Sequence, residues 1–74
     1  MDLPNIEFLI KSEGQINIGC IRPVGCVAIA NNESGTLAML KVQPKESLDD
    51  LLQRLDTAIE AALGYDEYID EINT

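Results

Sequence analysis

The amino-acid sequence predicts a small α+β protein: an antiparallel sheet of three to four strands covered on one face by one long amphipathic helix, in the order β-β-β-β-α. Two observations support this fold. Before residue 43, apolar residues alternate with polar ones or run almost uninterrupted in short segments, which is typical of strands. Helical periodicity replaces that pattern between residues 44 and 64. A chain of 74 residues is expected to form one domain, residues 1–74.

The helix is expected at about residues 47–63. Its apolar residues fall within an arc of about 120° when successive positions are placed roughly 100° apart. They are Leu48, Leu51, Leu52, Leu55, Ile59, Ala62 and Leu63. Ser47 is placed to accept a capping hydrogen bond from the N–H of Asp50, and Gly64 to end the helix in the left-handed conformation. Asp50 and Arg54 have the i,i+4 spacing of an ion pair.

Period-2 alternation predicts two strands in the first part of the chain, at about residues 5–11 and 15–21. The turn between them would place Gly14 at positive φ. These two strands are expected to form an antiparallel hairpin with one apolar face.

A second hairpin is predicted from strands at about residues 26–31 and 36–42. A loop over residues 31–35 would join them, with Gly35 at a left-handed position. Because these strands are apolar on both faces, a second covering layer is expected. It could come from the tail, from another protein or from a second subunit, and we favour a homodimer.

The charge distribution limits the possible partners. The formal net charge is −8, yet residues 1–45 are neutral, and residues 46–74 carry nine acids against Arg54 alone. This pattern argues against direct binding to nucleic acid or to an anionic membrane, and it favours a protein partner with a basic surface. The chain has no secretory signal and no apolar run long enough to span a membrane, so a cytoplasmic location is expected.

Residues that carry chemistry are scarce. The sequence has no histidine, its two cysteines cannot complete a zinc site, and it has no glycine-rich phosphate loop. We therefore expect no catalytic residues, no cofactor and no metal. Cys20 and Cys26 flank Pro23 and Gly25, where a chain reversal could bring them together as a redox pair or place four sulfurs across a dimer axis. We favour two small, buried apolar residues.

The candidate interaction surface lies on the helix and the tail. An acidic ridge formed by Asp49, Asp56 and Glu60, with Gln53 among them, spans roughly 60° of the helix. Asp56 and Glu60 are like charges at i,i+4, which is unfavourable for stability. The ridge could serve to meet a basic surface, but for any single residue we favour a solvated face of an acidic protein.

The acidic tail, residues 65–74, is expected to form a short helix or to dock loosely on the domain. Four apolar residues complete the candidate surface from this segment: Tyr65, Tyr68, Ile69 and Ile72.

These observations predict a small, acidic, non-enzymatic protein-interaction module, homodimeric, that docks on its partner through the helix or the tail. The alternative is a nucleic-acid mimic, an inhibitor of a basic DNA- or RNA-binding protein of the kind that phages and plasmids encode. It depends on the concentration of negative charge in residues 46–74.

Overall fold

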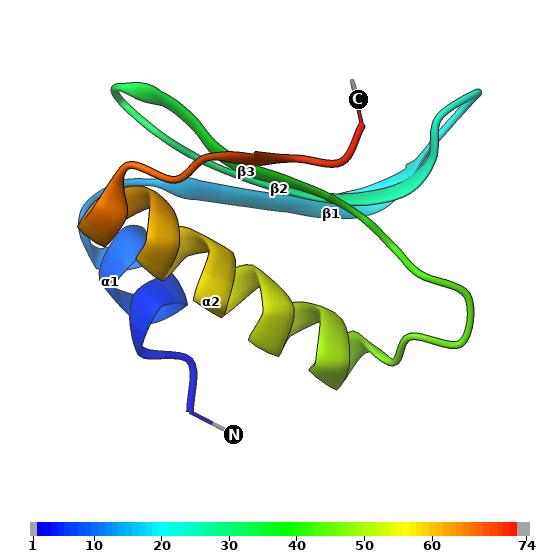
Figure 1. The fold of residues 1–74 in the computed structure, drawn as a ribbon, viewed down its shortest axis with the longest axis horizontal. Helices are drawn as coiled ribbons and strands as arrows, with labels where there is room; N and C mark the ends of the chain where they lie inside the picture. The colour runs from blue at the N-terminus through cyan, green and yellow to red at the C-terminus, as the bar shows by residue number, and fades with distance from the viewer. Residues whose placement is uncertain (1, 73–74) are drawn as a thin grey trace.

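The computed structural model describes residues 2–72, which form two helices and a four-stranded mixed sheet (Figure 1). The elements are α1 (Pro4–Lys11), β1 (Gln15–Ile21), β2 (Gly25–Asn32), β3 (Gly35–Lys41), α2 (Leu48–Tyr65) and β4 (Ile69–Asp70). The sheet order is β1-β2-β3-β4, with β1, β2 and β3 antiparallel and β4 parallel to β3. The predicted α+β class is confirmed, and the prediction of an entirely antiparallel sheet is wrong at β4.

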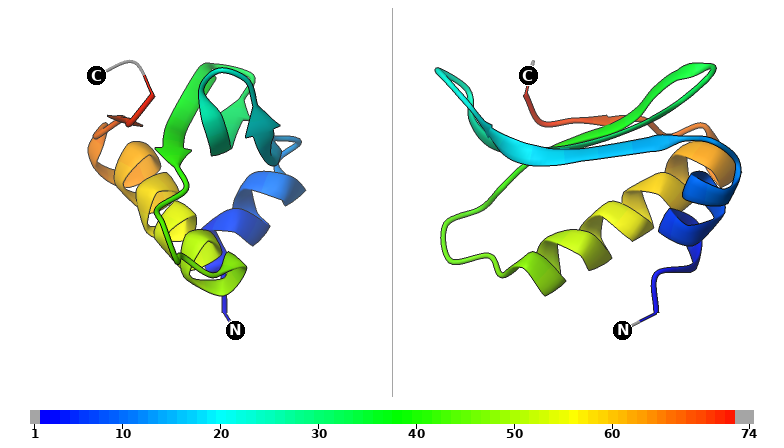
Figure 2. Two further views of the ribbon diagram at one scale, coloured as in Figure 1. Left: turned by 90° about the vertical axis from the view of Figure 1, so that its right-hand side faces the viewer. Right: turned by 180° about the vertical axis from the view of Figure 1, so that it is seen from behind.

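Both helices lie on the same side of the sheet (Figures 1 and 2). In the left view of Figure 2, α1 lies beneath the β1 side of the sheet and α2 beneath the β3 side, and α1 also packs against α2. No helix lies on the other side of the sheet within residues 2–72.

The first predicted strand, at about residues 5–11, is instead the helix α1. The first N–H groups of a helix have no acceptor within the helix, and in α1 a residue of α2 supplies one. The backbone N–H groups of Asn5 and Ile6 both donate to Asp56 Oδ1 at 2.8 Å. The local residue at the cap position, Leu3, provides no side-chain hydrogen bond. The alternation of apolar residues favours a strand locally, and a carboxylate about 50 residues away stabilises the helix.

The turn after α1 also differs from the prediction. Glu13 takes the left-handed conformation, with φ of 67°, and Gly14 does not have positive φ. Gly14 is required there for a different reason. A Cβ atom at this position would overlap the side chain of Leu9 and approach its carbonyl oxygen to 2.9 Å.

β1 and β2 form a hairpin that turns at residues 22–24, so the chain reverses at the Pro23/Gly25 interruption. The second predicted hairpin is confirmed in β2 and β3, and Gly35 has the expected positive φ, 135°. Its turn is shorter than predicted, Glu33 and Ser34 only, since both strands extend into the expected loop. The register shifts between Ala30 and Asn31, which leaves Leu37 as an extra residue in β3, buried in the core.

Helix α2 begins as predicted. Ser47 Oγ accepts a hydrogen bond of 3.0 Å from the N–H of Asp50. The helix ends two residues later than expected, with Asp66 in place of Gly64 in the left-handed conformation (φ 56°). The predicted apolar stripe is too wide, because Leu48 and Leu63 are exposed.

The core lies between the helices and the sheet and is entirely aliphatic. Small alanines on β2 and β3 allow α2 to approach closely, and the larger residues come from α1, β3 and α2. Its members are Leu9, Ala28, Ala30, Leu37, Ala38, Leu40, Leu51, Leu55, Ala58, Ile59 and Ala62.

Of the two alternatives predicted for the tail, a short helix or a segment docked loosely on the domain, the helix is wrong for the described residues. Ile69 and Asp70 pair with Ala38 and Met39 of β3, and the N–H of Glu71 donates to the Met39 carbonyl at 2.8 Å. The residues of the predicted tail after Ile72 lie outside the described part of the chain.

Candidate functional site

Exposed apolar side chains lie at the end of α2 and in the segment that leads into β4. We call these residues the tail surface: Leu63, Tyr65, Tyr68 and Ile69. The two tyrosines are the most accessible, at 72% and 61% of their full exposure. Ile72, which the sequence also predicts for this surface, is only partly exposed.

The segment that carries the tail surface is fixed at its far end by an ion-pair network. Arg54 Nη1 donates to both carboxylate oxygens of Glu71, at 2.8 and 3.0 Å. The Nε of the same guanidinium donates to Glu46 Oε2 at 2.9 Å. Arg54 therefore bridges the loop before α2 and the segment after β4, in place of the predicted pair with Asp50.

This network changes the acidity of its members. The hydrogen bond from Arg54, followed by the one from the Gln43 N–H, holds the pKa of Glu46 below its ordinary value of 4.5. The hydrogen bond that Arg54 donates to Glu46 is also the largest cause of the raised pKa of Arg54, and the hydrogen bond to Glu71 adds to it. Both shifts favour the charged forms that make the ion pairs.

The same residues close the β3 edge of the sheet. The N–H of Lys41 donates to Glu71 Oε1, and its carbonyl accepts from Arg54 Nη2, both at 2.8 Å. Two residues earlier in β3, the Met39 carbonyl accepts a hydrogen bond from the N–H of Glu71. The outward backbone groups at this end of β3 thus have partners, supplied by α2 and the tail.

The predicted acidic ridge is interrupted at its centre. Asp49, Gln53 and Glu60 are exposed, whereas Asp56 retains only 8% of its exposure because α1 packs over it. Besides the two backbone donors, the Asn5 side-chain amide reaches Asp56 Oδ2 at 2.9 Å and Glu60 Oε2 at 3.3 Å. Asp56 and Glu60, the like charges on α2, therefore share a donor in Asn5, which gives their proximity a structural explanation.

Sequence reasoning missed this role because it assigned residues 5–11 to a strand. Two local signals indicate a helix there, namely Pro4 in the first turn and Lys11 in the last. Each is weak alone against a period-2 apolar pattern.

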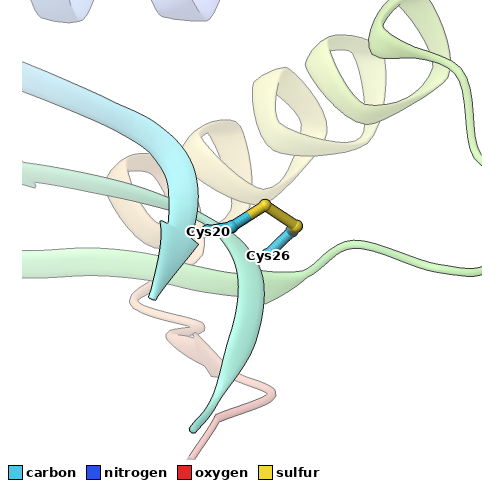
Figure 3. Close-up of a disulfide and its surroundings, with 2 residues drawn as sticks. All are labelled: Cys20 and Cys26. Atoms are coloured by element: carbon cyan, nitrogen blue, oxygen red, sulfur yellow. A yellow bond between two sulfur atoms is a disulfide. The ribbon is translucent and has the colours of Figure 1, made fainter. Parts of the chain in front are cut away.

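Cys20 and Cys26 form a disulfide that joins the end of β1 to the start of β2 (Figure 3). They face each other directly in the β1–β2 register, and both are exposed. The favoured interpretation, two small buried residues, is therefore wrong, and the alternative in which the reversal brings them together describes their placement.

The remaining features of residues 2–72 concern pockets, metal sites and membrane-spanning helices. This part of the chain contains no detectable pocket and no cluster of three side chains able to hold a metal ion. None of its helices is long and apolar enough to cross a membrane.

Comparison of the chain with protein-family models, with curated protein sequences and with solved structures gave no match.

Proposed function

We propose that this protein is a small, acidic, non-enzymatic interaction module that docks on a protein with a basic surface, and that the tail surface makes the contact. The observation that carries the proposal is the pair of exposed tyrosines, Tyr65 and Tyr68, on a segment fixed at both ends. The cytoplasmic location expected from the sequence stays a prediction.

Tyrosine is well suited to this role because its ring buries a large area and its hydroxyl group remains hydrated. A segment that is already ordered also loses little conformational entropy on binding. Here the chain before Tyr65 belongs to α2, and the chain after Tyr68 is held by β4 and by Glu71.

Charge supports a basic partner. Asp66, Glu67 and Glu60 lie on or next to the tail surface in sequence, and the described residues from 60 to 70 include no base. Such a surface attracts a basic patch at long range, and binding should weaken as salt screens the attraction.

The experiment compares partner binding by three proteins, the wild type, the double variant Tyr65→Ala/Tyr68→Ala, and Phe8→Ala. Phe8 is a matched control because it is an aromatic residue on α1 whose exposure, 60%, is close to the 61% of Tyr68. We expect the double variant to lose at least about tenfold in affinity, as typical interface tyrosines do, and Phe8→Ala to bind like the wild type. Equal binding by all three proteins, or binding that does not weaken with salt, would contradict the proposal.

The nucleic-acid mimic is less well supported. It requires a regular row of carboxylates, and the burial of Asp56 removes the central member of the α2 ridge. Asp49→Lys/Glu60→Lys separates the two functions, since it should abolish binding by a mimic and change docking through Tyr65 and Tyr68 much less.

A further inference from the structure

The two edges of the sheet differ in whether their outward backbone groups have hydrogen-bond partners. The β3 edge is closed by the tail and by Arg54, as described above. Beyond β1, the sheet has no further strand within residues 2–72. β1 is therefore an edge strand along its whole length.

The direction of the β1 backbone groups follows from a single hydrogen bond. The Cys26 carbonyl accepts from the N–H of Val42 at 2.9 Å, so the backbone of Cys26 faces β3. In an antiparallel strand the N–H and the carbonyl of one residue point to the same side, so neither group of Cys26 points to β1. Cys20 and Cys26 therefore form a non-hydrogen-bonded pair. The N–H and carbonyl of Cys20 consequently point away from β2, and by period-2 alternation so do those of Ile18 and Ile16.

This edge lacks the usual protection against pairing. Outside the strand ladder, the backbone hydrogen bonds among residues 2–72 do not include Ile16, Ile18 or Cys20. β1 contains no charged residue, no proline and no register shift, and Ile18 at its centre is 44% exposed. Natural edge strands generally carry at least one of these devices, and a strand without them is a template for another strand.

We infer that β1 pairs antiparallel with β1 of a second copy of this chain, about a two-fold axis at Ile18. The outward-facing residues are symmetric about that position, so Ile18 would lie opposite Ile18 of the partner subunit. Ile16 would lie opposite Cys20 of the partner subunit, and each such pair exchanges two backbone hydrogen bonds. The result is a continuous sheet with a self-complementary interface. This inference does not depend on the tail surface.

The charges that flank β1 are complementary to those of a second, antiparallel copy. Two chains of net charge −8 repel each other, and the imbalance lies after residue 45, whereas Gln15–Ile21 is uncharged. The charges that flank β1 are opposite, Glu13 before it and Arg22 after it. Antiparallel pairing about Ile18 brings Arg22 of one copy beside Glu13 of the partner subunit, and parallel pairing would bring like charges together.

The first test is the mass of the purified protein by sedimentation at increasing concentration, in low and in high salt. We expect a species of twice 8.1 kDa whose population rises with salt, because the repulsion between two chains of net charge −8 outweighs the attraction of the two exposed pairs of Arg22 with Glu13 of the partner subunit, and salt screens both. Docking of the tail surface on a basic partner has the opposite salt dependence, so either proposal can fail without the other. A protein of 8.1 kDa at every concentration and salt would overturn the inference.

The second test changes the edge itself. Ile18→Pro removes an N–H that points away from β2, so the β1–β2 ladder keeps its hydrogen bonds while the intermolecular ladder loses its centre. Ile18→Thr is the matched control, because it keeps the N–H and a β-branched side chain. We expect Ile18→Pro to be monomeric and Ile18→Thr to dimerise within about tenfold of the wild type. Dimerisation of Ile18→Pro at the wild-type concentration would overturn the inference.

Amide hydrogen exchange of the wild type provides a readout that needs no variant. The amides of Ile16, Ile18 and Cys20 should exchange slowly in the concentrated protein and faster on dilution. Fast exchange at every concentration, or protection that appears only when a different protein is added, would overturn the pairing of two copies.

Discussion

At the scale of single residues, Asp56 connects the two helices. Its carboxylate accepts from two backbone N–H groups at the start of α1 and from the Asn5 side chain. Removing a buried acceptor leaves these donors without partners, which costs more than the hydrogen bonds themselves contribute.

We expect Asp56→Ala to lower the free energy of unfolding by about 2–3 kcal/mol, measured by urea denaturation. Asp49→Ala on the same helix is the control, and because Asp49 is exposed we expect a change within about 0.5 kcal/mol. Equal effects of the two substitutions would show that Asp56 does not stabilise α1.

Gly14 provides a second test of how α1 is fixed on the sheet. We expect Gly14→Ala to lower the free energy of unfolding by about 1–3 kcal/mol, because the new methyl group would displace Leu9 from the core. Gly19→Ala in β1 is the matched control. A Cβ there has no neighbour within 4 Å, so thermal unfolding should change little. A similar loss of thermal stability in both variants would contradict this account.

At the scale of elements, the loop before α2 and the segment after β4 depend on one guanidinium. Because the pKa of folded Glu46 is below 4.5, its ionisation stabilises the folded protein. That contribution is present in full above about pH 4.5 and is lost as the pH falls through the lower, folded pKa.

We therefore expect Glu46→Gln to be less stable than the wild type at neutral pH, with a difference that shrinks as the pH falls below 4.5. Urea denaturation over a series of pH values measures this difference. Glu33→Gln is the control, because Glu33 lies in the exposed turn between β2 and β3, and we expect its stability at neutral pH to equal that of the wild type. A difference between Glu46→Gln and the wild type that stays constant with pH would contradict the assignment.

Elements whose stabilising contacts are local could be predicted from the sequence. Ser47 caps its own helix, and Gly35 turns its own hairpin, so α2, β2 and β3 follow from short-range patterns. α1 and β4 could not be predicted in this way. Asp56 caps α1 from about 50 residues away, and β4 pairs in parallel with a strand that lies before α2.

The candidate surface shows the same difference between what local sequence patterns predict and what depends on distant contacts. Tyr65, Tyr68 and Ile69 are exposed, as a surface segment after an amphipathic helix should be. Asp56 is not, because helical spacing shows which residues share a face but not which second helix covers that face.

At the scale of the whole molecule, both ends of the described chain are attached to α2. Asn5 contacts it through Asp56, and Glu71 through Arg54. These contacts join the two helices and the segment after β4, while the turn of the β1–β2 hairpin and its disulfide lie at one end of the sheet (Figures 1 and 3).

The closure of the β3 edge has a consequence for the number of copies that can join. A molecule with one pairing edge is monovalent, and its assembly stops when two copies meet. A molecule with two pairing edges is divalent, and each copy that adds leaves a new edge for the next. The tail, through β4 and Glu71, sets this valence.

Deleting residues 69–74 should convert the protein from a closed pair into a growing assembly, because it exposes the backbone groups of Met39 and Lys41. Light scattering should then increase with time and concentration. Ile18→Pro in the truncated chain restores a single edge, so its assembly should stop at two copies. Continued growth of that variant would show that the truncated chain aggregates by a route other than its sheet edges.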